Sequence, residues 1–220
     1  MNLYDFDFHL PEDRIALRPV SPRRAARMLV WDGAIHDSQA AALPDWLTPR
    51  DLLVFNTTKV IPARLNGTRK RATADGSGVA RVEVTLLKDL GNTTRQAFAK
   101  PAKKLKPGDQ ITFTAELRAD VIDKGAAGEV TLAFGTPEAE FRTALETAGD
   151  MPLPPYIAAK RAVDERDRSD YQTVFAEEEG SVAAPTASLH FAEVLLAALA
   201  AKGVQHTTLT LHVGAGTFLP

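Results

Sequence analysis

Two histidines, each beside a loop rich in glycine or proline, are the side chains of this chain best suited to move a proton. His190 ends the segment that begins at Gly180, and His212 comes shortly before the turn Gly214-Ala-Gly216. Imidazole titrates close to neutral pH and therefore serves as a general acid or base. A lone histidine in an apolar segment is more often structural, but two histidines on one α/β unit favour chemistry. We take His190 and His212 as the candidate catalytic residues.

Metal chemistry is not expected from this pattern. Neither a His-x-x-x-His spacing nor an obvious carboxylate triad accompanies the two histidines, so the sequence predicts no metal site. The chain has no cysteine, which excludes disulfides and cysteine-based zinc sites and fits a reducing cytosol.

Polar residues that follow a predicted strand are candidates for substrate binding. The segment Asn56-Thr57-Thr58-Lys59 comes directly after the predicted strand Asp51–Phe55 and offers an amide, two hydroxyls and an ammonium group. Ligands of α/β sheets bind where strands end. A polar turn that caps itself explains the same residues about as well. Arg64, a little further along, either guards a pocket or is a solvated surface arginine.

Glycines and aromatic rings near the histidines form a second group of candidates. Gly214 and Gly216 make half of a nucleotide-binding glycine fingerprint. Because the third glycine and a following helix are missing, a plain tight turn is an equal alternative. Tyr156, Phe191 and Phe218 either stack on a purine or pack in the core.

Basic side chains cluster in three segments of a chain whose net charge is only −2. Such clusters either contact a phosphate backbone or form solvated surface. The three segments are residues 14–27, 64–71 and 100–106. We expect any RNA contact to involve Arg23, Arg24, Arg27 or Lys59 rather than the third segment, because the first group lies near the candidate loops.

Short strands dominate the middle of the chain. Six candidates lie between Val60 and Phe134, and turn signals such as Pro107-Gly108-Asp109 separate most of them. Val82, Val84 and Leu86 alternate with polar residues, as in a half-buried strand. Many short strands without intervening helices predict a small antiparallel barrel or sandwich.

Helices are expected only after these strands. Thr136 is the predicted N-cap of a helix that Gly149 ends, and a second helix over residues 191–202 leads into a strand over residues 204–213. Residues 151–157 are expected to be extended because of their prolines, and residues 51–55 form a buried strand. The predicted fold class is an α/β body, a mixed sheet with helices, with an inserted small antiparallel β-barrel. The predicted domains are residues 1–59 (body, first part), 60–151 (barrel) and 152–220 (body, continued).

The termini and the apolar runs bear on location. The N-terminus has no basic head followed by an apolar run, so it is not a secretory signal. The longest apolar stretch, residues 194–201, is too short to cross a bilayer. We expect a cytoplasmic protein with no membrane contact. The chain stops within its most informative stretch, so we also expect it to be the N-terminal part of a longer protein.

Several long motifs together resemble one known family. The most distinctive are Asp51-Leu-Leu-Val-Phe-Asn-Thr-Thr-Lys-Val-Ile-Pro-Ala-Arg-Leu65, Met151-Pro-Leu-Pro-Pro-Tyr-Ile157 and Thr210-Leu-His-Val-Gly-Ala-Gly-Thr-Phe218, with Tyr171-Gln-Thr-Val-Phe175, Val182-Ala-Ala-Pro-Thr-Ala187 and Leu189-His-Phe191 between them. In this order they resemble the S-adenosylmethionine:tRNA ribosyltransferase-isomerases of queuosine biosynthesis. The barrel region, residues 68–134, matches more loosely.

The resemblance implies a transferase that uses S-adenosylmethionine as a ribosyl donor. The implied acceptor is the 7-aminomethyl-7-deazaguanine at the wobble position of a tRNA, and the implied products are epoxyqueuosine-tRNA, adenine and methionine. No metal or redox cofactor and no obligate protein partner are implied, and we expect a monomer. The sulfonium acidifies the adjacent ribose C5′ hydrogen, so the reaction needs a base, and a donor must help adenine leave. His190 and His212 are the candidates for these roles.

The candidate site follows from this resemblance and from the elements described above. A helix packed antiparallel to the strand that follows it brings its start close to the far end of that strand. His190 and the turn at Gly214 should therefore share one pocket for S-adenosylmethionine. The proposed substrate-binding residues are Asn56, Thr57, Lys59, Arg64, Tyr156, Thr186, Phe191, Gly214, Gly216 and Phe218, and the proposed RNA-binding residues are Arg23, Arg24 and Arg27.

Two positions depart from the family pattern, and two other functions stay open. Arg50 and Ser188 stand where the family usually has glycine, and family members continue well past the last motif. One alternative is a non-catalytic RNA-binding protein that uses the barrel and the basic segments as a platform. The other is an inactive, truncated scaffold.

Overall fold

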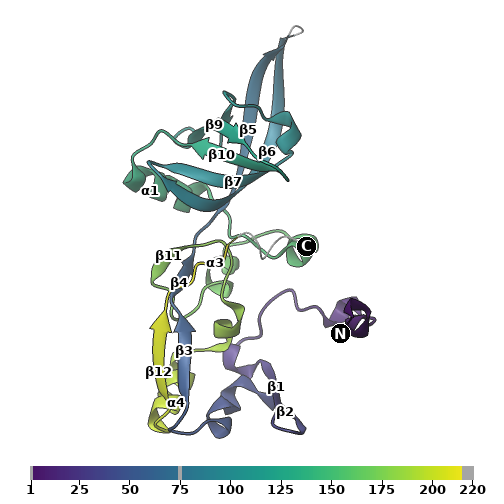
Figure 1. Ribbon diagram of the computed structural model, residues 1–220, viewed down its shortest axis with the longest axis vertical. Helices are drawn as coiled ribbons and strands as arrows, with labels where there is room; N and C mark the ends of the chain where they lie inside the picture. The colour runs from purple at the N-terminus through teal and green to yellow at the C-terminus, as the bar shows by residue number, and fades with distance from the viewer. Residues whose placement is uncertain (1, 74–75, 215–220) are drawn as a thin grey trace.

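The computed structural model describes residues 2–73 and 76–214. Figure 1 shows two parts stacked along the long axis, with a barrel at one end and a body of strands and helices at the other. Two stretches of chain pass between them. They lie side by side at an isolated bridge in which Arg64 and Asp150 exchange both backbone hydrogen bonds, at 3.2 and 2.8 Å. A Cβ atom at Gly149 would come within 2.0 Å of the Pro62 carbonyl oxygen, so only glycine allows this close approach.

Six antiparallel strands close into the barrel, in the order β10-β7-β6-β5-β8-β9. Val82, Val84 and Leu86 point into it and are at most 2% exposed, as their alternation predicts. The bounds are β5 Arg64–Thr73, β6 Gly76–Gly91, β7 Thr94–Lys100, β8 Gln110–Thr112, β9 Arg118–Lys124 and β10 Glu129–Ala133. The predicted antiparallel barrel is thereby confirmed, whereas the division of the chain at residues 60 and 151 stays a prediction.

Helix α1 (Glu138–Ala148) covers one end of the barrel. Its apolar residues Phe141 and Leu145 are buried in the same cluster as the barrel side chains. The predicted cap by Thr136 is wrong. The Thr136 hydroxyl instead donates to the Phe134 carbonyl at 3.0 Å, and Pro137 stands at the N-cap without a side-chain hydrogen bond.

The body is built on two consecutive strands, β3 (Leu52–Asn56) and β4 (Thr58–Val60). Each has one parallel partner: β12 (Gln205–Leu209) pairs with β3, and β11 (Glu178–Ser181) pairs with β4. Figure 1 shows β11 and β12 along the same side of these strands. Helix α4 (Glu193–Ala201) packs Leu195 and Leu199 into a cluster that also contains Leu53. The predicted mixed α/β body is thereby confirmed.

Within residues 2–73 and 76–214, the other face of β3 and β12 is largely exposed. Leu52 and Val54 are 56% and 53% exposed, and Leu209 and Leu211 are 41% and 64% exposed. The strand predicted to be buried at residues 51–55 is therefore covered on one face only, where Leu53 packs against the cluster of α4. The strand expected over residues 204–213 ends at Leu209, because the residues after it are held by side chains instead of a backbone ladder.

Short elements complete the body. Helix α2 (Pro155–Ala158) corrects the expectation of an extended segment at residues 151–157: Pro155 occupies its first turn, where no backbone donor is needed. The remaining elements of the body are β1 Arg27–Trp31, β2 Ile35–Gln39, α3 Arg166–Asp170 and the 3-10 helices η1 Leu3–Phe6, η2 Glu12–Arg14, η3 Arg23–Ala25, η4 Ala40–Trp46 and η6 Thr186–His190. One further 3-10 helix, η5 (Ala102–Lys104), lies in the barrel between β7 and β8. Among the described residues, no helix combines the length and apolar character needed to cross a membrane.

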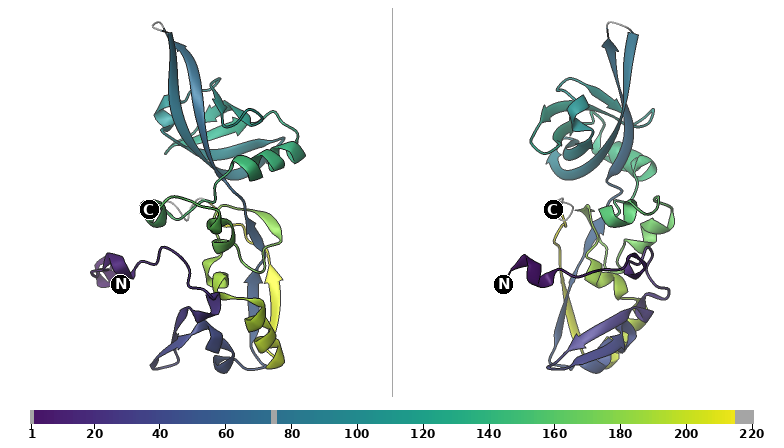
Figure 2. Two further views of the ribbon diagram at one scale, coloured as in Figure 1. Left: turned by 180° about the vertical axis from the view of Figure 1, so that it is seen from behind. Right: turned by 90° about the vertical axis from the view of Figure 1, so that its right-hand side faces the viewer.

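A buried carboxylate ties the N-terminal segment to the body. The side chain of Asp167, in α3, is fully buried and accepts hydrogen bonds from Arg18 and Arg161. The Asp164 backbone N–H also donates to it, at 2.9 Å. Figure 2 shows the N-terminal segment extending away from the body beyond this attachment.

Candidate functional site

Polar side chains replace the backbone ladder where β3 ends. The Asn56 amide nitrogen donates to the Leu211 carbonyl at 2.8 Å, and the Leu211 N–H donates to the Asn56 amide oxygen at 3.0 Å. The hydroxyl of Thr57 lies 2.7 Å from that of Thr210. Asn56 and Thr57, both predicted to bind substrate, therefore hold the neighbouring chain segment.

Ser181, at the end of β11, holds the next residues of that segment. Its hydroxyl accepts a hydrogen bond from the Val213 N–H at 3.0 Å and donates to the Ala183 carbonyl at 2.7 Å. The Val182 N–H donates to the Val213 carbonyl at 3.0 Å. The segment is thus fixed on both sides of His212.

The ring of His212 lies between β4 and β11. Its Nδ1 is 2.8 Å from the Thr58 hydroxyl. A Cβ atom at Gly180 would come within 2.8 to 3.0 Å of three of its ring atoms. Gly180 has a φ of +147°, a conformation that other residues rarely adopt. The Thr58 hydroxyl on β4 and the backbone of Gly180 on β11 therefore hold the imidazole between them.

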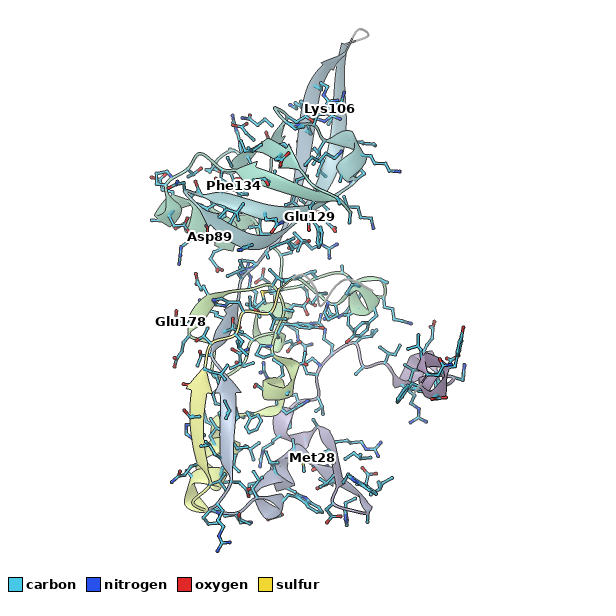
Figure 3. All side chains as sticks on the ribbon, in the orientation of Figure 1. Met28, Asp89, Lys106, Glu129, Phe134 and Glu178 are labelled. Atoms are coloured by element: carbon cyan, nitrogen blue, oxygen red, sulfur yellow. The ribbon has the colours of Figure 1, made fainter. Side chains whose placement is uncertain are left out.

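His212 lines a cavity of about 690 Å³ between the barrel and the body. Gly180 and Gly214 join it on the body side, and apolar side chains including Leu87 and Phe98 form part of the barrel side. Figure 3 shows Asp89 and Glu129, which also line the cavity, on the part of the barrel nearest the body. A mixed apolar and charged lining of this size suits a small polar organic ligand.

Ion pairs join the two parts beside this cavity. Arg142 of α1 contacts Glu138 of its own helix at 3.1 Å and Glu179 of β11 at 3.2 Å. Glu179 also pairs with Lys59 at 2.9 Å, and this hydrogen bond raises the pKa of Lys59 above its usual value. Lys59, predicted to bind substrate, is thus engaged with a carboxylate.

His190 is not among the residues that line this cavity. It is exposed at the end of η6, so the predicted single pocket for both histidines is not formed here. Phe191 packs against Phe55 and Phe175, with ring centroids 4.8 and 5.9 Å apart, and is therefore part of the core.

The other predicted binding residues are dispersed. Tyr156 is 59% exposed and Thr186 is exposed, and neither lines the cavity. Arg64 forms an ion pair with Glu83 on the barrel. Gly216 and Phe218 lie outside the described residues.

The predicted RNA-binding arginines differ in their surroundings. Arg23 donates to the backbone carbonyls of Ser169, Gln172 and Leu189, so its guanidinium holds the body together. Arg27 pairs with Asp37 at 2.6 Å on an exposed surface. Arg24 is exposed, and no ion pair joins it to a described residue.

Sequence reasoning missed the residues that position His212. Thr58 supplies one of the two hydroxyls that follow the predicted strand, but its contact with His212 is not evident from the sequence. The sequence likewise gives Gly180 no role beside His212. Alternation along the strand places the side chain of Thr58 on the face opposite to those of Thr57 and Lys59, and this signal is present in the sequence. The contact of Gly180 with the ring depends on the fold and has no such signal. Residues 2–73 and 76–214 contain no group of three or more histidine, aspartate or glutamate side chains placed to hold a metal ion.

Comparison with known proteins gives a consistent result. Residues 3–220 match the model of a family described as queuosine biosynthesis protein. An S-adenosylmethionine:tRNA ribosyltransferase-isomerase of Ruegeria pomeroyi is 57% identical over 221 residues, and one of Maricaulis maris is 55% identical over 222 residues. Each alignment covers all of this chain but only 63% of the relative.

A solved structure also matches. The crystal structure of an S-adenosylmethionine tRNA ribosyltransferase from Thermotoga maritima is 27% identical, with a TM-score of 0.36. The match covers 95% of this chain and 58% of that one. The chain therefore spans less than two thirds of the length of these relatives.

Proposed function

Because this chain belongs to the family of queuosine biosynthesis proteins, we propose that it carries part of the active site of a tRNA ribosyltransferase-isomerase. The proposed reaction moves the ribosyl group of S-adenosylmethionine to the 7-aminomethyl-7-deazaguanine at the wobble position of tRNA. Its products are epoxyqueuosine-tRNA, adenine and methionine, and it uses no metal or redox cofactor. The names of relatives that align with the whole chain support this proposal.

The observation that carries the proposal is an immobilised imidazole at the wall of a ligand-sized cavity. The volume of about 690 Å³ is within the usual range for small-molecule sites. In this site, the apolar side chains Leu87 and Phe98 are available to the adenine of S-adenosylmethionine. Lys88 and Glu129, which also line the cavity, have the charges that a methionine carboxylate and ammonium require.

His212 is the proposed base of the first step. The positive sulfur of S-adenosylmethionine acidifies the hydrogens on the adjacent ribose C5′ carbon. When Nδ1–H of His212 donates to the Thr58 hydroxyl, Nε2 keeps its lone pair and can accept one of these hydrogens as a proton. The electron pair stays on C5′, next to the sulfonium that stabilises it. We place S-adenosylmethionine in the cavity beside His212 because His212, unlike His190, lines it.

The test is His212→Asn in a protein of the same length as the relatives. Loss of a general base costs about 10² to 10⁴ in rate, so we expect kcat to fall by that factor while the Kd for S-adenosylmethionine changes little. Adenine release and ribosyl transfer to tRNA are measured separately. His190→Asn is the matched control, since His190 does not line the cavity. Adenine release at an unaltered rate in His212→Asn would overturn the assignment.

A further inference from the structure

A second groove, of about 700 Å³, lies on the outer face of the barrel and shares no lining residue with the cavity beside His212. It crosses four strands, from Lys100 on β7 over Arg81 on β6 and Thr68 on β5 to Thr112 on β8. At the usual strand spacing this row is about 14 Å long. That length exceeds a single phosphate group and suits an extended chain.

The charge of the groove is positive. Its charged lining residues are Arg64, Arg81, Lys100 and Glu83. Arg64 and Glu83 pair with each other. Arg81 and Lys100 are exposed, and neither forms an ion pair with a residue of the described ranges. Two cations therefore remain available in a protein whose net charge is −2.

Neutral side chains in the groove complement these charges. The hydroxyl-bearing side chains of Thr68 and Thr112 are half-buried along its floor. Threonine hydroxyls and basic side chains are common partners of the phosphates in protein–nucleic acid interfaces.

Gly67 shapes the groove at its aromatic end. A Cβ atom at this position would come within 2.6 Å of Phe113 and 2.9 Å of Ile111, so only glycine lets β8 and the Phe113 ring lie against β5. Phe113 is half-buried: its ring packs against the barrel core and lies 6.1 Å from the Phe134 ring, centroid to centroid. Its remaining exposed part lines the groove and can stack on a base.

We propose that this groove binds the sugar-phosphate backbone of an RNA strand through Arg81 and Lys100, with Phe113 as a stacking surface. The choice of RNA rests on the proposed function, and the groove itself rests on the geometry above. The proposal moves part of the expected RNA contact from the arginines near residue 24 to the barrel, including Lys100 of the third basic segment.

The test compares two double variants of the 220-residue chain that remove the same charge. In Arg81→Ala/Lys100→Ala, loss of two phosphate contacts should weaken binding of a tRNA transcript at least tenfold at low salt. The slope of log K against log salt should fall by about 1.4 to 1.8, as expected for two lost contacts. Lys103→Ala/Lys104→Ala is the control, because these two lysines of η5 do not line the groove. It should change the slope much less.

Three outcomes would overturn the proposal. One is an equal effect of both double variants, which indicates general electrostatic attraction. Another is an unchanged slope in the groove variant. The third is displacement of the transcript by AMP as readily as by an oligonucleotide, which indicates a site for a small anion. The assay contains no S-adenosylmethionine, so failure of the ribosyl-transfer proposal is detected separately, in the measurements on His212.

Discussion

At the scale of single residues, the position of His212 depends on two neighbours that perform no chemistry themselves. The Thr58 hydroxyl hydrogen-bonds with Nδ1 of the His212 ring, and Gly180 has no Cβ atom that would collide with the ring. General acid–base catalysis requires the nitrogen to lie within hydrogen-bond reach of the proton it takes. A small displacement of the ring should therefore reduce turnover even when the histidine itself is retained.

Gly180→Ala should produce that displacement. Its new Cβ would meet the ring at 2.8 to 3.0 Å, and the φ of +147° adds backbone strain. In a protein of the relatives' length, we expect kcat to fall at least tenfold, the pH–rate profile to change, and the NMR signals of the His212 ring to move. Gly203→Ala is the control, because it is also strained, with a φ of +83°, but its Cβ would contact only Pro49. Equal losses of turnover in both variants would mean that strain alone is responsible.

The sequence identifies His212 as a candidate but not the residues that surround it. Its residue type and its glycine-rich turn are local features. The partner segments come from positions about 30 and 150 residues away. No local pattern specifies such a contact. Asn56 and Thr57 illustrate the same limit: they look like ligand-binding residues, and in the fold their side chains hydrogen-bond to the carbonyls of Leu211 and Leu209.

At the scale of elements, Asp167 joins α3 to the N-terminal segment and should make stability sensitive to acid. Burial raises its pKa, but the hydrogen bonds from Arg161 and the Asp164 backbone, with the charges of Arg161 and Arg18, outweigh that effect, so the pKa of Asp167 lies below its usual value of 3.8. A lowered pKa means that the stabilisation is complete above about pH 4. It is lost as the pH falls through the folded-state value.

Asp167→Asn tests this account through urea unfolding at several pH values. The change leaves Arg161 without its carboxylate partner, while Arg18 keeps Asp164 and Asp170, and it should cost about 3 kcal/mol at pH 7. The variant should also lose less stability than the unaltered chain between pH 4 and pH 2, since its side chain does not titrate. Asp123→Asn, at an exposed position on β9, should have little effect on either quantity. Parallel acid curves for the Asp167 variant and the unaltered chain would contradict the prediction.

The elements themselves were predictable to different degrees. Five of the six barrel strands overlap predicted ones, because apolar and polar residues alternate over Val82–Leu86 and turns with glycine or proline separate most of the runs. The first, β5 (Arg64–Thr73), lies mostly beyond the strand predicted at residues 60–65. The end of β12 at Leu209 is not predictable from the sequence. The alternation of apolar residues continues to Leu211, although Leu209 and Leu211 face solvent in the structure. Alternation predicts which residues share a face, but it does not reveal whether another element covers that face.

At the scale of the whole molecule, the two-part fold follows from the sequence more readily than the site does. A change from helix–strand alternation to a run of short strands marks the barrel. The cavity beside His212 lies where the two parts meet, and its lining comes from β6, β7, β10, α1, β11, the segment after β12 and Ile61 before β5. Such a site depends on how the parts are placed relative to each other, which no local pattern contains.

The bridge between Arg64 and Asp150 has a consequence for how the protein can be taken apart. It holds the points where the chain enters and leaves the barrel next to each other. For the body, the 85 residues between Arg64 and Asp150 therefore act like a loop whose two ends are adjacent. The entropy of closing a loop depends only weakly on its length, so a three-residue glycine-serine linker from Pro62 to Met151 should close the same gap. The shortened body should unfold cooperatively, and the excised barrel with α1 should do so independently. A barrel-free body without a cooperative transition would show that the two parts form a single folding unit.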